Sequence, residues 1–173
     1  LGKVLADPEH PFVAILGGAK VSDKIEVIEN LISRVDRLLI GGAMAYTFFK
    51  AMGKPVGRSL VEDDKLDAAR DIIARAQDRH PGATLASPLL LLPVDHVVAE
   101  KIDAGSRAET LSVEDAAIGE RMGLDIGPQT VAAYAAVLRD AKTVVWNGPM
   151  GVFEIDAFAK GTIAVAEAVA LVK

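Results

Sequence analysis

The stretch PFVAILGGAKVSDK, residues 11–24, runs from apolar residues through two glycines to two lysines. Phe12 to Leu16 predict a fully buried β-strand, because five consecutive apolar side chains leave no polar face for solvent. Gly17 and Gly18 allow a tight turn and let backbone N–H groups come close to a ligand. This strand and its turn set the frame into which the rest of the chain must fit.

A helix is expected to begin just after the turn, since Asp23 and Glu26 have the spacing of a capping box. Lys20 and Lys24 then lie around its amino-terminal end, where the helix dipole disfavours cations. Two lysines beside peptide N–H groups that already favour an anion indicate an anion-binding turn. The alternative is a solvent-exposed turn with ordinary surface lysines, because the glycines match neither of the common phosphate-loop patterns.

Composition limits the classes of protein to which this chain can belong. Its 173 residues suffice for one domain, and 51% hydrophobic with 25% charged residues is a balance typical of globular proteins. The net charge of −5 argues against binding of nucleic acid or of an acidic membrane surface. The absence of cysteine excludes disulfides, thiolate metal sites and cysteine nucleophiles. With no membrane-length apolar run and no signal-peptide pattern, we expect a cytoplasmic protein.

Beyond residue 24 the chain alternates between short apolar runs and segments whose apolar residues have helical spacing. Strands are expected at residues 37–40, 89–92 and 143–146, the last of them buried, with 96–99 continuing the second beyond Pro93. Helices are expected at 22–35, 43–52, 62–79, 128–141 and from Asp156 onward, with Asp156 as the cap. This alternation predicts an α/β fold, a Rossmann-like three-layer α/β/α arrangement with a mostly parallel sheet.

Three glycine-bearing turns follow predicted strands, and the carboxyl ends of parallel strands meet at one edge of a sheet, where ligands bind. These turns are Gly17-Gly18, Gly41-Gly42 and Asn147-Gly148-Pro149. The predicted cleft has Lys20 and Lys24 on one side and Asn147 and Glu154 on the other. Three such turns at one edge indicate a site for a nucleotide or a phosphate group.

Six segments, in this order, resemble the carboxy-terminal domain of phosphoglycerate kinase: GGAKVSDK, LLIGGAMAYTF, VGRSL, LPVDHVVAEK, MGLDIGP and VVWNGPMGVFE. They cover the chain from about residue 11 to about residue 166, and the first and last are the most specific. The resemblance implies the glycolytic transfer of a phosphoryl group between 1,3-bisphosphoglycerate and ADP, giving 3-phosphoglycerate and ATP. In this family the carboxy-terminal domain holds the magnesium nucleotide and the amino-terminal domain holds the phosphoglycerate.

The resemblance also implies roles for individual residues. Lys20 would approach the transferring phosphoryl group, as the catalytic residue, and Lys24 would hold the nucleotide phosphates; lysine supplies the compact positive charge that phosphoryl transfer needs. Glu154 would accept hydrogen bonds from the ribose hydroxyls. The other nucleotide-binding positions that it implies are Gly18, Ala19, Gly41, Gly42, Leu60, Gly123, Leu124, Asn147, Pro149, Gly151 and Val152.

The chain also departs from the family pattern. That pattern continues past Lys173 into a glycine-rich loop with a metal-linked aspartate, and it includes a phosphoglycerate-binding domain that is absent from this sequence. The resemblance therefore implies that residues 1–10 end an interdomain helix or linker and that 11–173 form a partial nucleotide-binding domain, its sheet incomplete at the carboxy-terminal end. We expect this chain to be inactive alone, the full-length protein to be monomeric, and Mg²⁺ to bind through the nucleotide. Residues 81–88 resemble a surface insertion.

Two alternatives remain open. One is a nucleotide-binding module without catalysis, and the other is a Rossmann-type dehydrogenase domain, which the missing GxGxxG pattern disfavours. The histidines at positions 10, 80 and 96 lack the spacing of metal ligands, so no metal site is expected. Trp146 is expected to be a core residue rather than a platform for a base.

Overall fold

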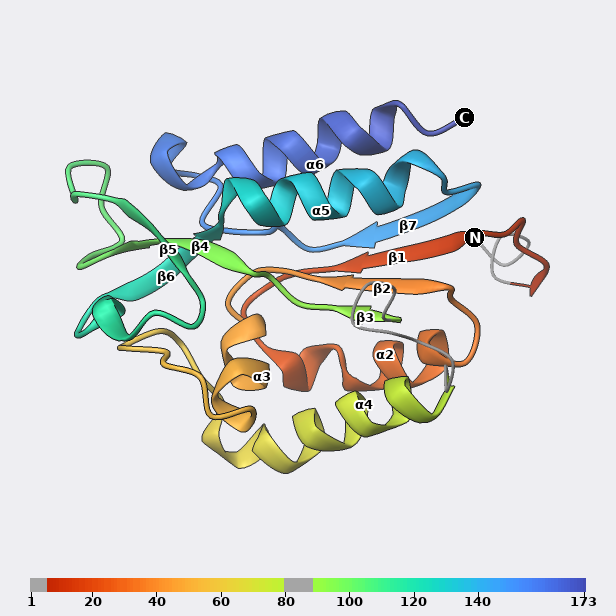
Figure 1. Cartoon of the computed structure of the whole chain (residues 1–173), viewed down its shortest axis with the longest axis horizontal. Coiled ribbons are helices and arrows are strands. Elements are labelled where there is room, and N and C mark those ends of the chain that lie inside the picture. The colour runs from red at the N-terminus through yellow and green to blue at the C-terminus, as the bar shows by residue number, and fades with distance from the viewer. Residues whose placement is uncertain (1–5, 80–88) are drawn as a thin grey trace.

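A four-stranded parallel sheet forms the centre of the computed structural model, which describes residues 6–79 and 89–173 (Figure 1). Its strand order is β3-β2-β1-β7, and each neighbouring pair is parallel. The strands are β1 (Phe12–Leu16), β2 (Arg37–Ile40), β3 (Leu90–Leu91) and β7 (Thr143–Asn147). The first two have the bounds expected from the sequence, because uninterrupted apolar runs mark central parallel strands clearly.

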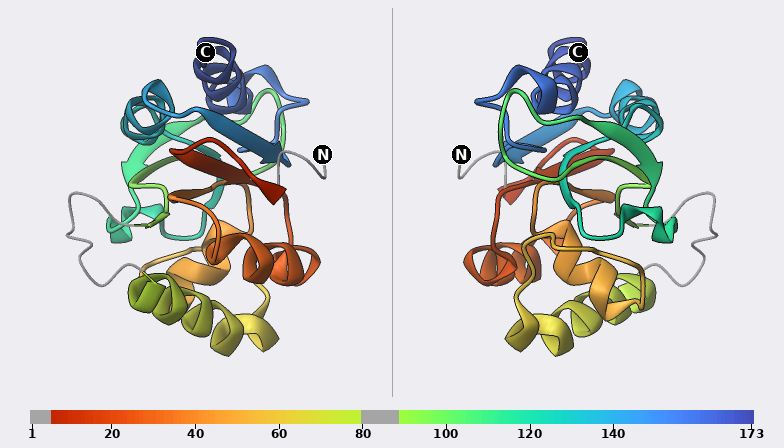
Figure 2. Two further views of the ribbon diagram at one scale, coloured as in Figure 1. Left: turned by 90° about the vertical axis from the view of Figure 1, so that its right-hand side faces the viewer. Right: turned by 90° about the vertical axis from the view of Figure 1, so that its left-hand side faces the viewer.

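Helices cover both faces of this sheet, which confirms the three-layer α/β fold (Figure 2). One face carries α2 (Ile25–Ile32), α3 (Ala45–Ala51) and α4 (Leu66–Arg79), and the other carries α5 (Pro128–Arg139) and α6 (Lys160–Ala170) (Figure 1). Short 3-10 turns lie at Val21–Asp23, Asp63–Lys65, Ala116–Ile118 and Asp156–Phe158. In the ranges that the structure describes, no helix is long and apolar enough to cross a bilayer.

The core consists of two apolar clusters separated by the parallel sheet. Side chains of β1 alternate between them: Phe12, Ala14 and Leu16 pack toward α2–α4, whereas Val13 and Ile15 pack toward α5 and α6. All five are at most 2% exposed, which confirms the predicted buried strand. The expectation that residues 143–146 are equally buried was wrong, since β7 pairs only with β1 in the described chain and these residues are only partly buried.

A second, antiparallel sheet lies beside the carboxyl ends of the parallel strands (Figure 1). It consists of β4 (Asp95–Ala99), β5 (Glu109–Ser112) and β6 (Met122–Ile126) in the order β5-β4-β6. Residues 96–99 therefore do not continue the strand at 89–92 in the same sheet, as the sequence suggested. Pro93 has no backbone N–H to donate to a ladder, and the chain leaves the parallel sheet there. The strands β5 and β6 were not expected.

Two predicted helix caps were wrong. Asp23 lies in a 3-10 turn and α2 begins at Ile25, with Lys24 as the N-cap residue and no side chain capping it. Asp156 also lies in a 3-10 turn, and α6 begins at Lys160 without a side-chain cap from its N-cap residue. The helices predicted from residues 22 and 43 are accordingly shorter than expected, and the one predicted from residue 62 opens with a 3-10 turn.

Buried aspartates of the small sheet supply acceptors to the first turns of α5 and α6. Asp95 accepts hydrogen bonds from the N–H groups of Gln129 (2.9 Å) and Thr130 (2.8 Å) in the first turn of α5. Asp125 accepts one from the N–H of Gly161 (2.9 Å) in the first turn of α6. A carboxylate beside the amino-terminal end of a helix is stabilised by the helix dipole. The small sheet thus anchors both helices on one face of the parallel sheet.

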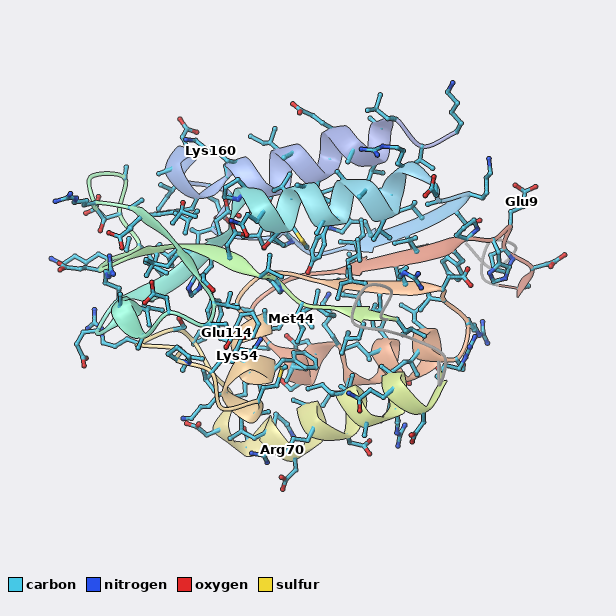
Figure 3. The ribbon with its side chains drawn as sticks, viewed as in Figure 1. Glu9, Met44, Lys54, Arg70, Glu114 and Lys160 are labelled. Carbon is cyan, nitrogen blue, oxygen red and sulfur yellow. The ribbon has the colours of Figure 1, made fainter. Side chains whose placement is uncertain are left out.

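On the opposite face the small sheet is attached through an ion pair. Lys54, which follows α3, lies 2.9 Å from the carboxylate of Glu114, which follows β5 (Figure 3). The lysine ammonium also lies over the Phe49 ring, 5.6 Å from its centroid. Of the remaining expectations, the linker at residues 1–10 lies partly, and the insertion at 81–88 and His80 lie wholly, outside the described residues.

Candidate functional site

The three glycine-bearing turns meet at one edge of the parallel sheet, as predicted. The N–H of Gly17 donates to the carbonyl of Asn147 (2.9 Å), and the N–H of Gly18 donates to that of Pro149 (3.1 Å). The N–H of Gly42 donates to the carbonyl of Met150 (3.1 Å). Backbone hydrogen bonds therefore fasten the turns after β1, β2 and β7 into one continuous rim.

Glycine is required where these turns approach one another. Gly42 has a φ of 72°, in the left-handed region, and a Cβ atom there would lie 2.5 Å from both the N and the O of Gly18. A Cβ atom on Gly17 would lie 2.1 Å from the carbonyl oxygen of Pro149. Side chains at these positions would push the turns apart.

Lys24 is the cation held at this rim. Its Nζ donates a hydrogen bond of 2.5 Å to Oδ1 of Asn147, which ends β7. The N-cap position of Lys24 on α2 places its ammonium group at the positive end of a helix. Lys20 is exposed and precedes the 3-10 turn Val21–Asp23. Two lysines and exposed peptide groups thus border the rim, an arrangement that suits an anion.

A pocket of about 280 Å³ opens beside the rim, between the parallel sheet and the small sheet. Its walls contain most of the predicted nucleotide-binding residues: Gly18, Ala19, Gly42, Leu60, Gly123, Leu124, Pro149, Gly151, Val152 and Glu154. Lys20, Lys24, Gly41 and Asn147 lie outside these walls. Gly41 packs directly against Met150, a residue of the pocket wall, because a Cβ atom at position 41 would collide with the sulfur of Met150.

Most of the pocket lining is apolar, and the charged Glu154 lies at its exposed side. Ile102, Met122 and Met150 contribute to its walls beside the glycines and alanines, whereas Glu154 is exposed. Trp146 is half-buried against the cluster under α5 and α6, and its Nε1 donates to the carbonyl of Gly148 (2.7 Å). Trp146 is not among the residues that line this pocket, but it is only partly buried and therefore lies at the margin of the core rather than inside it.

Sequence reasoning missed the polar residues of the interior. The hydroxyl of Tyr46 lies 2.8 Å from Nδ1 of His96, and both side chains line the pocket. Tyr46 is 5% exposed and His96 is 1% exposed. Burial lowers the pKa of His96 to about 4, so its imidazole is neutral at neutral pH. The available signal in the sequence was a histidine directly before the apolar residues VVA of β4. Its partner Tyr46, however, lies 50 residues away in the chain.

Asp125 is the second polar residue that was missed. It lines the same pocket and is 4% exposed. Burial raises the pKa of its carboxyl group to about 6, although the N–H groups of Gly161 and Ile126 donate to it and favour the ionised form. Asp125 follows Leu124 in the MGLDIGP segment, and only its position on β6 reveals its contact with α6.

Asp125 should make the stability of the chain fall as pH rises through the weakly acidic range. Its pKa is raised on folding from 3.8 to about 6, so the folded chain retains a proton that the unfolded chain has lost. Between about pH 4.5 and about pH 7.5, wild type should lose roughly 2 kcal/mol of unfolding free energy relative to Asp125→Asn. Urea denaturation of both proteins across this range measures the difference. The exposed Asp156→Asn should follow wild type, and a pH-independent difference for Asp125→Asn would contradict the prediction.

No group of three or more histidine, aspartate or glutamate side chains is arranged to hold a metal ion in residues 6–79 and 89–173. The groups at the rim are ammonium and peptide N–H donors together with the amide of Asn147. These donors bind the anionic oxygen atoms of a ligand. They cannot bind Mg²⁺ themselves, because this ion takes oxygen atoms as its ligands.

Comparison with known proteins places this geometry in a family. The family model described as phosphoglycerate kinase matches residues 1–173. The phosphoglycerate kinase of Pseudothermotoga lettingae is 54% identical over 173 residues, which are 100% of this chain and 42% of that protein. The one from Clostridium novyi is 58% identical over 171 residues, covering 98% of this chain and 41% of that protein.

Solved structures give the same result. Phosphoglycerate kinase from Coxiella burnetii superposes with a TM-score of 0.92 at 41% identity, covering 99% of this chain and 42% of that one. The enzyme from Pyrococcus horikoshii superposes with a TM-score of 0.79 at 30% identity, covering 98% and 41%. The chain therefore spans about two fifths of the length of the relatives that it matches.

Proposed function

Because this chain belongs to the phosphoglycerate kinase family, we propose that it forms the nucleotide-binding part of a phosphoglycerate kinase. The whole protein would transfer a phosphoryl group between 1,3-bisphosphoglycerate and ADP, giving 3-phosphoglycerate and ATP. The observation that carries this proposal is the rim of three hydrogen-bonded turns, with Lys24 held against Asn147 beside an apolar pocket.

The two parts of the site match the two parts of a nucleotide. The base and ribose would occupy the apolar pocket, where the exposed carboxylate of Glu154 can accept hydrogen bonds from ribose hydroxyls. The phosphates would lie at the rim beside Lys20 and Lys24. Among the described residues, the N–H groups of Ala19 and Lys20 have no hydrogen-bond acceptor, so both are free to donate to phosphate oxygens.

Phosphoryl transfer requires little covalent chemistry from the protein. It requires accurate positioning of the substrates and positively charged groups beside the negatively charged equatorial oxygens of the transferring group. Lys20, on the exposed side of the rim, would approach the transferring group, while Lys24 would hold the nucleotide phosphates. Mg²⁺ would enter with the nucleotide, because the rim offers N–H donors rather than a set of carboxylates. When bound, the ion would neutralise charge on the phosphate oxygens.

The second substrate would bind outside this chain. The matched relatives are more than twice as long as the chain. We propose that 1,3-bisphosphoglycerate or 3-phosphoglycerate is held by the part of the full-length protein that corresponds to the uncovered length of these relatives. We propose that the full-length protein is a cytoplasmic monomer that binds neither nucleic acid nor membranes.

Calorimetric titration of the chain with Mg-ADP tests the nucleotide site. Saturable binding of Mg-ADP is expected, with no binding of NAD, because the glycine pattern of a dinucleotide-binding turn is missing after β1. Mg-pyrophosphate should bind more weakly than Mg-ADP, since it engages only the rim. A folded chain that binds neither Mg-ADP nor Mg-pyrophosphate would overturn the proposal, and tighter binding of NAD would favour a dehydrogenase domain.

The chain by itself should show no turnover with 1,3-bisphosphoglycerate and Mg-ADP. Fixing both substrates next to each other supplies much of the barrier reduction in such reactions, about 7–11 kcal/mol in well-oriented systems. With 1,3-bisphosphoglycerate, the phosphoryl donor, held outside these residues, that contribution is lost. A coupled spectrophotometric assay, with a full-length family member as the positive control, measures the rate. Turnover by the 173-residue chain would show instead that it binds both substrates.

A further inference from the structure

A pair of hydrogen-bonded polar side chains lies within the largely apolar wall of the pocket. The hydroxyl of Tyr46 is 2.8 Å from Nδ1 of His96, and the two rings stack with centroids 5.7 Å apart and an interplanar angle of 24°. Tyr46 comes from α3 on one side of the pocket and His96 from β4 on the other. The pair therefore joins the helical layer to the small sheet at the pocket.

The remaining nitrogen of this pair has no partner. His96 Nε2 is the one buried side-chain nitrogen or oxygen without a hydrogen bond in the part of the chain that the structure describes. By contrast, the buried carboxylate of Asp125 receives N–H donors on both oxygens. Buried polar atoms in folded proteins nearly always have partners, so an exception in the wall of a ligand pocket calls for an explanation.

The pairing assigns a tautomer to His96. Its imidazole is neutral, so one ring nitrogen carries a hydrogen and the other accepts. The hydroxyl of Tyr46 has no other acceptor among the described residues, and the phenol therefore donates to Nδ1 of His96. Nε2 then carries the hydrogen, which leaves a fixed N–H donor that lacks an acceptor.

The pair lies directly behind a residue predicted to contact the nucleotide. A Cβ atom on Gly123 would lie 1.6 Å from the hydroxyl oxygen of Tyr46, so this hydroxyl fills the space that a side chain at position 123 would occupy. Gly123 and Leu124 line the pocket together with His96. A ligand that fills the apolar part of the pocket therefore lies against the wall that contains His96. A hydrogen-bond acceptor on that ligand would face this wall.

We propose that His96 is a specificity-determining residue of this pocket, whose Nε2–H donates a hydrogen bond to a ring nitrogen of the bound purine base while Tyr46 holds its tautomer. The proposal rests on the proposed nucleotide-binding function. Purine ring nitrogens are acceptors, and they lie at the apolar end of a nucleotide, away from the phosphates at the rim. Nε2 is buried in the ligand-free chain, so the proposal requires the wall beside it to open when the base binds.

Nitrogen-15 NMR of the histidine side chains tests this contact on the unaltered chain. The sequence has three histidines, and the signals of His96 are assigned by their loss in His96→Phe. The free chain should show the tautomer with hydrogen on Nε2. Saturation with Mg-ADP should shift the Nε2 resonance, whereas saturation with Mg-pyrophosphate, which lacks a base, should leave it unchanged. An unchanged Nε2 resonance with Mg-ADP bound, or an equal shift with Mg-pyrophosphate, would overturn the proposal.

Two substitutions give an independent measurement. His96→Phe keeps an aromatic ring but removes Nε2, and it should weaken Mg-ADP binding about five- to tenfold without changing Mg-pyrophosphate binding. His10→Phe is the matched control, because His10 pairs with Asp36 at the opposite edge of the parallel sheet, and it should bind Mg-ADP as wild type does. Equal affinity of wild type and His96→Phe for Mg-ADP would contradict the inference while leaving nucleotide binding intact. Failure of wild type to bind Mg-ADP at all would overturn both proposals.

Discussion

Replacing Lys24 with alanine is expected to lower the affinity of the chain for Mg-ADP by ten- to a hundredfold. A hydrogen bond between two charged groups contributes about 1.5–3 kcal/mol, which corresponds to roughly this range of affinity. Lys24 is already oriented by its 2.5 Å hydrogen bond to Asn147, so little side-chain entropy is lost when phosphate binds. Calorimetric titration of wild type and Lys24→Ala measures the change.

Lys142→Ala is the matched control for this experiment. Lys142 is exposed and lies next to the first residue of β7, at the opposite edge of the sheet from the rim. Its loss changes the net charge as much as Lys24→Ala does but leaves the rim intact. Similar weakening by both substitutions would mean that general electrostatic attraction, rather than a local contact with Lys24, holds the nucleotide.

Gly42→Ala is expected to destabilise the chain by more than about 3 kcal/mol. Part of this cost, about 1–2 kcal/mol, comes from placing a side chain in the left-handed backbone region. The larger part comes from a collision of the new Cβ atom with backbone atoms of Gly18 at 2.5 Å, which no rotamer change can relieve. Urea denaturation measures the loss of unfolding free energy.

Gly53→Ala separates the two contributions. Gly53 has a φ of 79°, close to the 72° of Gly42, but nothing lies within 4 Å of its potential Cβ atom. This substitution should therefore cost only the backbone term of about 1–2 kcal/mol. If both variants lose the same stability, the close approach of the turns contributes nothing and the rim is less tightly packed than its hydrogen bonds indicate.

Most of the parallel sheet could be predicted because local sequence determines it. The strands at 12–16 and 37–40 are uninterrupted apolar runs, and their bounds agree with β1 and β2. The predicted helix starts at Asp23 and Asp156 were wrong because local capping signals were assumed. No side chain caps α2 from its N-cap position, and the first turn of α6 receives its acceptor from Asp125 on a distant strand. The strand β5 was missed because most of its residues are exposed, and β6 was missed because Gly123 and Asp125 interrupt its apolar pattern.

The site shows the same division. The meeting of three turns follows from parallel strand order alone, so the rim could be predicted from the positions of the glycines. The contact between Lys24 and Asn147 joins residues 123 positions apart, and only the fold reveals it. The pairing of Tyr46 with His96 depends on the position of the small sheet, which the sequence did not indicate.

The distant caps of α5 and α6 have a consequence for the order in which the chain folds. Thr130 and Gly161 depend on carboxylates that precede them by 35 and 36 residues, so neither helix start is complete until β4 and β6 are in place. Contacts of such separation require loop closure first, which is a slow step. During refolding, the amide hydrogens of these two turns should become protected from exchange together with those of the antiparallel strands, and later than those in the middle of α4.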